Sequence, residues 1–130
     1  MVGIVILSQS KKLAEGVKEI ADRVTDNKVR IVAVGGVDNG LNGTESIRIM
    51  EAILTADSGD GVVMIFDLGS SVASAQSAIN LLDDEKKKQV VFADAPVLEG
   101  TIGAALGASE GAALNDVVAA AEEAYELQKF

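Results

Sequence analysis

Four short polar segments contain most of the residues in this sequence that could bind or activate a ligand. They are Ser-Gln-Ser at residues 8–10, Gly-Gly-Val-Asp-Asn-Gly at 35–40, Asp-Leu-Gly-Ser-Ser at 67–71 and Asp-Ala-Pro at 94–96. Hydroxyl groups and the N–H groups at a helix start can hold an anion such as a phosphate. A carboxylate such as that of Asp67 can accept a hydrogen bond and orient the donor. These segments therefore favour anion or phosphoryl chemistry.

Each segment also has a purely structural interpretation. Ser8 or Ser10 would cap a helix that begins just after it, because serine is a common N-cap residue. The glycines of residues 35–40 would be turn residues with a positive φ angle. Asp67 would simply end a strand, and the serines of residues 69–71 would open the next helix. In the functional alternative, residues 69–71 present backbone N–H groups to an anion.

The composition excludes several other kinds of site. The chain has neither cysteine nor histidine, so thiolate chemistry, histidine-ligated metals and Ser-His-Asp catalysis are ruled out, and we expect no metal and no cofactor. Residues 35–44 lack the lysine of a phosphate-binding loop, and no G-x-G-x-x-G motif follows the first apolar run. With 11 Lys and Arg against 20 Asp and Glu, the net charge is −9. Nucleic acid and anionic membranes are therefore poor partners.

Apolar residues predict the elements that position the polar segments. Nearly continuous runs of Val, Ile and Phe at residues 2–7, 29–34, 61–66 and 89–93 are typical of parallel strands covered on both faces. Helical spacing of apolar residues fills the gaps and the C-terminal part. These stripes are Leu13, Val17, Ala21 and Val24; Ile47, Met50 and Leu54; Val72, Ala75, Ile79 and Leu82; Leu98, Ile102 and Ala105; and Leu114, Val117, Ala121 and Ala124 or Tyr125.

This alternation predicts a three-layer α/β/α fold, with a central four-stranded, mostly parallel sheet and helices on both faces. A length of 130 residues suits one domain covering residues 1–130. Ligands bind beyond the carboxyl ends of such strands, so the polar segments should meet at one edge. We expect a solvated turn at the lysines of residues 86–88. No segment suits export or membrane spanning, so we expect a soluble, cytoplasmic protein.

Taken together, these segments resemble the phosphotransferase subunit of PTS-dependent dihydroxyacetone kinase, in the mannose-type enzyme IIA group. The similar segments are residues 4–8, 13–17, 35–44, 67–70 and 94–100, in order along the chain. The resemblance implies an α/β fold with a mostly parallel sheet and a homodimer. The apolar excess of residues 102–118 also favours a homodimer.

The resemblance implies a phosphoryl relay. The histidine phosphocarrier protein donates a phosphoryl group to a histidine of this subunit, which passes it to ADP held on a partner subunit. A third subunit binds dihydroxyacetone, which the regenerated ATP phosphorylates. The family motif is Ser-His-Ser, but here it is Ser-Gln-Ser, so Gln9 occupies the acceptor position. A carboxamide has no nucleophilic ring nitrogen.

Two functions follow from this substitution. The chain is either a phosphoryl-carrier subunit that is inactive in this copy or a non-catalytic regulatory or binding module of the phosphotransferase system. The resemblance and the topology place Gln9 beside Asp67. In the family, the carboxylate at this position should accept an N–H of the acceptor histidine. In this chain, Asp67 should accept an N–H of the Gln9 carboxamide. We expect Asp38 to shape the glycine loop or to meet a partner. The residues expected to bind the phosphoryl group or to form its loops are Ser10, Gly36, Asp38, Gly69, Ser70 and Ser71.

Overall fold

The fold is built on a parallel sheet, seen here in a computed structural model that describes residues 1–37 and 43–130. In these residues the strands are β1 (Gly3–Leu7), β2 (Ile31–Val34), β3 (Val62–Phe66) and β4 (Val90–Phe92). They form one four-stranded sheet in the order β2-β1-β3-β4, and every neighbouring pair is parallel. The predicted α/β fold with a parallel sheet is confirmed.

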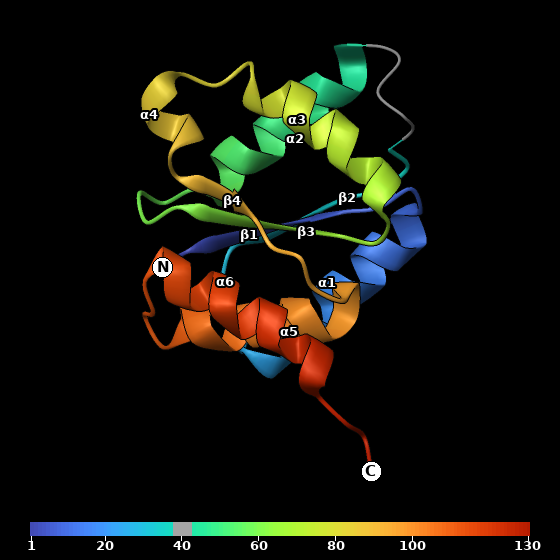
Figure 1. Ribbon diagram of the computed structural model, residues 1–130, viewed down its shortest axis with the longest axis vertical. Helices are drawn as coiled ribbons and strands as arrows, with labels where there is room; N and C mark the ends of the chain where they lie inside the picture. Colours follow the sequence, from blue (N-terminus) through green and yellow to red (C-terminus); the bar gives the residue numbers. More distant parts are fainter. Residues whose placement is uncertain (38–42) are drawn as a thin grey trace.

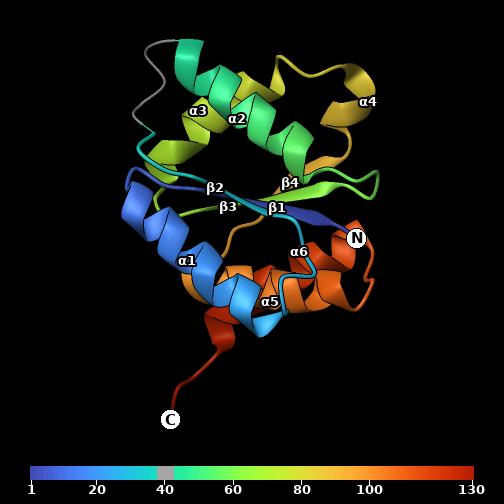
Figure 2. The ribbon, with the colours of Figure 1, turned by 180° about the vertical axis from the view of Figure 1, so that it is seen from behind.

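Helices cover both faces of the sheet (Figure 1). The α-helices are α1 (Lys11–Val24), α2 (Gly43–Ala56), α3 (Val72–Ile79), α4 (Asp84–Lys87), α5 (Val97–Ser109) and α6 (Leu114–Glu122), and the 3₁₀ turns are η1 (Gly69–Ser71) and η2 (Glu123–Glu126). Helices α1, α5 and α6 lie on one face, and α2 and α3 lie on the other (Figure 2). Within the described ranges, none of these helices has the length and apolar character needed to cross a membrane.

Strand β1 is one of the two inner strands of the sheet, and the sheet separates two hydrophobic cores. Ile4 and Ile6 pack with residues of α1, α5 and α6, whereas Val5 and Leu7 pack with residues of α2 and α3. Because both faces are covered, successive residues of the strand are all buried. This explains the continuous apolar run, and it means that Ser8 follows directly from the best-buried strand of the sheet.

The buried face of α2 differs from the predicted stripe. Ile47 and Leu54 are 49% and 46% exposed, so the prediction that they face the core is wrong. The sheet instead packs against a face made of Ile49, Ala52, Ile53 and Ala56. A Cβ atom at Gly3 would lie 2.0 Å from the carbonyl oxygen of Ala56. The end of α2 therefore approaches β1 closely on this face.

The other stripes are closer to the structure. On α1, Val17 and Ala21 are buried as predicted, whereas Leu13 and Val24 near the helix ends are exposed. The buried face of α1 is formed by Ala14, Val17 and Ala21. Leu13 and Val24 are apolar but not part of the core.

Helices α5 and α6 pack closely along small residues. A Cβ atom at Gly103 would lie 2.7 Å from the carbonyl oxygen of Ala120. The buried apolar residues of this pair include Ala104, Ala105, Ala108 and Val117. Much of the apolar excess that favoured a homodimer is therefore used within the chain.

The predicted solvated turn at residues 86–88 is only partly solvated. Lys86, at the end of the one-turn helix α4, forms an ion pair with Asp57, whose side chain is 3% exposed. Burial alone would raise the pKa of Asp57, but hydrogen bonds from Lys86 and the N–H groups of Gly59 and Gly61 leave it below its ordinary value. The ion pair ties α4 to the segment that follows α2.

Candidate functional site

The carboxyl ends of β1, β2 and β3 bring three of the four polar segments together. The N–H of Ser8 donates to the carbonyl oxygen of Val34 at 3.0 Å, and the N–H of Val37 donates to that of Ser8 at 3.2 Å. The N–H of Asp67 donates to the carbonyl oxygen of Leu7 at 3.2 Å. Residues 8–10, 35–37 and 67–71 therefore meet at one edge of the sheet, as the topology predicts.

The carboxylate of Asp67 is the centre of this edge. Its Oδ2 accepts hydrogen bonds from Ser8 Oγ at 2.8 Å and from the main-chain N–H of Gln9 at 3.2 Å. Its Oδ1 accepts from the N–H of Leu68 at 2.7 Å and from Ser71 Oγ at 3.2 Å. Four donors from two loops therefore fix the position of one carboxylate.

The side chain of Gln9 points to Ser70. Its Nε2 donates a hydrogen bond to Ser70 Oγ at 2.8 Å. The expectation that the carboxamide of Gln9 donates to Asp67 is therefore wrong, because the main-chain N–H of Gln9 makes that contact instead. Residue 9 does lie beside Asp67 as expected, but the two meet through the backbone.

Ser8 and Ser10 have different roles. Ser10 is the N-cap of α1, where its Oγ accepts from the N–H of Leu13 at 3.2 Å. Ser8 is completely buried, and its Oγ also accepts from the N–H of Ser10 at 2.9 Å. From the sequence, Ser8 belongs to a candidate segment that follows a strand and is also a possible cap. The structure shows that Ser10 makes the cap and that Ser8 contacts Asp67.

The glycine segment after β2 behaves partly as expected. Gly36 has a φ of 71°, the positive value that glycine adopts easily. Gly35 is needed for a close approach instead, since a Cβ atom there would lie 2.2 Å from Lys11 Cα. The carbonyl oxygen of Gly35 accepts from Arg48 at 2.8 Å. Asp38 lies outside the residues that the structure describes.

The loop after β3 leads into the 3₁₀ turn η1. Ser71 is buried, its N–H donates to the carbonyl oxygen of Leu68 at 3.1 Å, and its hydroxyl donates to Asp67. Its donors are therefore engaged within the protein. Gly69 and Ser70 are exposed, so this part of the loop is the part that a ligand can reach.

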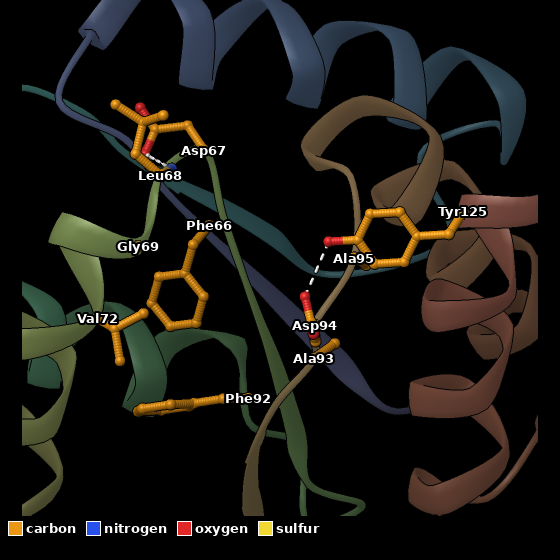
Figure 3. Close-up of a pocket in the computed structure, with 10 residues that line it drawn as sticks. All are labelled: Phe66, Asp67, Leu68, Gly69, Val72, Phe92, Ala93, Asp94, Ala95 and Tyr125. Carbon is orange, nitrogen blue, oxygen red and sulfur yellow. Dashed lines mark hydrogen bonds between the residues drawn. The ribbon is translucent and has the colours of Figure 1, made fainter.

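A pocket of about 280 Å³ lies beside the Asp67 loop and brings in the fourth polar segment (Figure 3). Its lining includes Phe66, Asp67, Leu68, Gly69, Val72, Phe92, Ala93, Asp94, Ala95 and Tyr125. The rings of Phe66 and Phe92 meet edge to face with centroids 5.1 Å apart. The Tyr125 hydroxyl donates to Asp94 Oδ1 at 2.8 Å, and this hydrogen bond to a carboxylate raises the pKa of Tyr125.

The chemistry available at this edge is that of hydroxyls, backbone N–H groups and carboxylates. Across residues 1–37 and 43–130, no three His, Cys, Asp or Glu side chains gather in a way that could hold a metal ion. Gln9 is exposed, and it stands at the end of the central strand beside the fixed carboxylate of Asp67. The geometry suits the presentation of the side chain at position 9 to a partner.

The EIIA-man family, the fructose IIA component of the PTS system, matches residues 3–118 of the chain. The chain is a member of the EIIA-man family. This EIIA-man chain is similar to subunits named phosphoryl donor subunit DhaM of PEP-dependent dihydroxyacetone kinase. It is 32% identical to the protein of Providencia stuartii and 36% identical to that of Escherichia coli, over 99% of this chain.

The extent of these matches differs between relatives. The chain spans 28% of the length of the Providencia and Escherichia proteins. A shorter relative, the phosphoryl donor subunit DhaM of kinase 2 from Listeria innocua, is 34% identical over 82% of this chain and 85% of its own length. The EIIA-man chain therefore corresponds to most of the Listeria subunit and to a fraction of the two longer ones.

Solved structures agree with the fold of this EIIA-man chain. The crystal structure of EF1359, a protein of unknown function, superposes with a TM-score of 0.76 and 30% identity over 94% of both chains. A DegV family protein of Corynebacterium glutamicum has a TM-score of 0.60 over 95% of this chain and 49% of its own, at 20% identity. The second likeness concerns the fold alone.

Proposed function

We propose that residues 1–130 form one EIIA-type phosphotransferase domain, the phosphoryl-carrier part of a PTS-dependent dihydroxyacetone kinase. The names of the relatives support this proposal. The observation that carries it is the position of residue 9. This residue is exposed at the carboxyl end of the central strand, with its main chain held by Asp67 and its side chain next to Ser70.

A histidine at position 9 would suit phosphoryl transfer. A ring nitrogen of neutral imidazole would attack the phosphorus of a phosphohistidine on the donor protein. The new P–N bond would form while the P–N bond to the donor breaks. The donor ring, protonated on its other nitrogen, would leave as neutral imidazole, and the acceptor ring, which keeps its own N–H, would take on the positive charge. The hydroxyl of Ser70 and nearby N–H groups would hold phosphoryl oxygens without a full positive charge. A site of this kind can release its phosphoryl group again.

Gln9 cannot perform this step, and among the described groups beside it neither Ser8 nor Asp67 is suited to replace it. Its carboxamide nitrogen is a hydrogen-bond donor without a nucleophilic lone pair. Ser8 is completely buried. The oxygens of Asp67 accept four hydrogen bonds, which lowers their nucleophilicity. We therefore propose that this copy does not accept a phosphoryl group.

The partners follow from the same proposal. They are the histidine phosphocarrier protein, the ADP-binding subunit and the dihydroxyacetone-binding subunit of the kinase, with a second copy of this chain in a homodimer. Because the subunit would pass its phosphoryl group to ADP, we propose that the protein acts in the cytoplasm. Because the α5–α6 pair uses much of its apolar surface within the chain, support for the homodimer comes mainly from the family resemblance.

A phosphotransfer assay tests this function. The phosphocarrier, charged with labelled phosphate, is mixed with the unchanged chain, with Gln9→His and with Gln9→Asn. Acid-labile label should appear on Gln9→His alone and should then pass to ADP when the kinase subunits are added. The asparagine variant controls for a change of side chain without an imidazole. Labelling of the unchanged chain, or a folded Gln9→His protein that stays unlabelled, would overturn the proposal.

A second candidate is a non-catalytic regulatory or binding module of the phosphotransferase system. The absence of histidine from the entire sequence favours it, since no other imidazole can take over the reaction. In this case the unchanged chain should bind the phosphocarrier and alter its transfer to another acceptor. A transfer assay from the phosphocarrier to another acceptor, run with and without the unchanged chain, distinguishes the two candidates, because an inert copy without a regulatory role would leave that transfer unaltered.

A further inference from the structure

The pocket drawn in Figure 3 has an apolar side and an acidic side. The apolar side includes Val72 and the rings of Phe66 and Phe92, which meet edge to face. Across from the rings lie Asp94 and Tyr125, joined by the hydrogen bond from the phenol to Oδ1 of the carboxylate. A cation is attracted both to the face of an aromatic ring and to a carboxylate. The two sides therefore favour the same kind of ligand, a cation on an apolar stem.

Asp94 keeps one carboxylate oxygen without a hydrogen bond. The residue is exposed, and its Oδ1 accepts from the hydroxyl of Tyr125. Across the part of the chain that the structure describes, no donor is bound to its Oδ2. A second carboxylate lies close by, since Oε2 of Glu122 accepts the main-chain N–H of Asp94 at 3.0 Å. A cation that entered the pocket would therefore find an acceptor at its acidic side.

The sequence around this acidic side contains little positive charge. Residues 89–128 contain seven Asp or Glu residues and no Lys or Arg. The next basic residue, Lys129, is already bound to Glu99 at 3.0 Å. The charged residues in the lining of the pocket are Asp67 and Asp94. This negative charge is complementary to a basic partner, and a partly enclosed site strengthens the attraction.

The size and the edges of the pocket indicate that its ligand is a side chain of another protein. The volume of about 280 Å³ lies just below the range of about 300–1,000 Å³ that is usual for pockets enclosing a whole small molecule. Two lining residues, Leu68 and Tyr125, are 57% and 61% exposed. A protein would cover these apolar surfaces together with the pocket, whereas a small cation would leave them in water.

Arginine is the side chain that suits both sides of the pocket. Its guanidinium group is planar and weakly hydrated, so it stacks on aromatic rings, and it can donate two N–H groups to one carboxylate. The ammonium group of lysine is compact and strongly hydrated, so it gains less from a ring. Arginine is also enriched among the residues that dominate protein interfaces.

We propose that this pocket is a docking site for an arginine side chain of a partner protein, with the guanidinium group held by Asp94 and by the rings of Phe66 and Phe92. The site does not require a histidine at position 9. It therefore goes beyond the phosphoryl-carrier function and would operate in the chain as it stands.

A pair of peptides tests the site on the unchanged protein. One is Gly-Leu-Arg-Leu-Gly with both ends blocked, and the other carries citrulline, a neutral isostere, in place of arginine. The arginine peptide should shift the amide NMR signals of Gly69, Ala93 and Ala95 in a saturable way. Its affinity should be at least about fivefold higher than that of the citrulline peptide. Equal affinities, or no binding of the arginine peptide, would overturn the inference, and a lysine peptide of equal affinity would overturn the choice of arginine.

Asp94→Asn tests the carboxylate itself. The amide oxygen of asparagine can still accept from the hydroxyl of Tyr125, but the preference for arginine over citrulline should disappear. Asp116→Asn is the matched control, because it removes the same charge from an exposed residue in the first turn of α6 and should leave the preference unchanged. Loss of the preference in both variants, or in neither, would overturn the inference. If Asp94→Asn does not fold, the peptide comparison on the unchanged protein still decides the question.

A second copy of this chain is the alternative occupant of the pocket. It is detected by recording the same amide signals without peptide at increasing protein concentration. Concentration-dependent shifts of Gly69, Ala93 and Ala95 would assign the pocket to a second copy and overturn the inference, whereas constant signals support it. None of these measurements involves phosphoryl transfer. Their outcome is therefore distinguishable from that of the labelling assay.

Discussion

Gln9 and Ser70 meet across the gap between the loops that follow β1 and β3, with Nε2 of Gln9 2.8 Å from Oγ of Ser70. Both residues are exposed. Water can therefore replace this hydrogen bond when either side chain is changed. Position 9 is open to substitution, whereas the buried groups behind it are not.

The fold should tolerate a histidine at position 9. We expect Gln9→His to change the free energy of unfolding by less than about 1 kcal/mol, because one exposed hydrogen bond is lost and no core residue is touched. Urea unfolding of the two proteins checks this expectation. A loss larger than about 2 kcal/mol would show that the carboxamide has a structural role that its exposure does not indicate.

Asp67 should be much less tolerant. In Asp67→Asn, one carboxylate oxygen becomes an NH₂ group that faces two donors, and the charge that strengthens the other contacts is lost. We expect a cost of about 2–3 kcal/mol in the free energy of unfolding. Asp60→Asn is the matched control, since Asp60 is 62% exposed and pairs with the N-terminal amine. Equal effects of the two changes would contradict the central place given to Asp67.

The ion pair of Asp57 and Lys86 should give stability a pH dependence. The folded protein holds the pKa of Asp57 below its ordinary value of 3.8. Its contribution is therefore complete above the unfolded pKa and is lost as the pH falls through the lower folded pKa. We expect Asp57→Asn to flatten the fall in stability between about pH 5 and pH 2. Urea unfolding across that range measures the slope, and an unchanged slope would contradict this assignment.

Removal of the cation should also destabilise the protein. Lys86→Met leaves the buried carboxylate of Asp57 without its charged donor, at a cost of about 2 kcal/mol near neutral pH. Lys88→Met is the control, because the Lys88 side chain is 72% exposed and pairs with exposed Glu85. That change should cost less than about 0.5 kcal/mol. A similar cost for both lysines would show that α4 is a surface turn, as the sequence suggested.

Two glycines of α5 should respond differently to alanine. At Gly103 the new Cβ would lie 2.7 Å from the carbonyl oxygen of Ala120, so α5 and α6 must separate, at a cost of about 1–3 kcal/mol. At Gly107 the nearest atom is 3.8 Å away. Gly107→Ala should therefore be neutral or stabilise the helix by up to about 1 kcal/mol. Thermal unfolding of the pair checks the difference, and the opposite order would exclude close α5–α6 packing.

Association with the phosphocarrier should depend on salt. With a net charge of −9, the chain would attract a phosphocarrier whose docking face is basic. Salt would screen this attraction, because the Debye length is about 10 Å at 0.1 M. We expect the association rate in stopped-flow mixing to fall several-fold as ionic strength rises. The melting temperature at each salt concentration controls for stability. A rate that is independent of salt would rule out electrostatic steering.

The strands were predictable because their physical signal is simple. A run such as residues 2–7 is apolar at every position, and few structures other than a strand covered on both faces require this. The face of α2 was not predictable in the same way. Ile47, Ile49 and Leu54 are equally apolar, so the sequence does not show which face packs on the sheet. The end of α2 approaches β1 closely at Gly3 and Ala56, and this is a tertiary contact.

The site was predictable in its position more than in its contacts. Strand order alone brings Gln9, Asp67 and Ser70 to one edge. Sequence patterns do not say which donors reach the carboxylate first, so the side chain of Gln9 was assigned to Asp67 instead of Ser70. The sequence indicates the segment 8–10 as a candidate, but the burial of Ser8 and its contact with Asp67 depend on three elements that meet only in the folded protein.

The contact of Tyr125 with Asp94 gives the protein a built-in optical signal. Tyr125 is the only tyrosine, and the chain has no tryptophan, so its phenol dominates the intrinsic fluorescence. The hydrogen bond to a carboxylate makes that emission sensitive to any change at Asp94. Tyr125 lines the same pocket as Asp67, Leu68 and Gly69. Binding at this edge can therefore be followed by tyrosine emission in the unlabelled protein, without a dye or an added fluorophore.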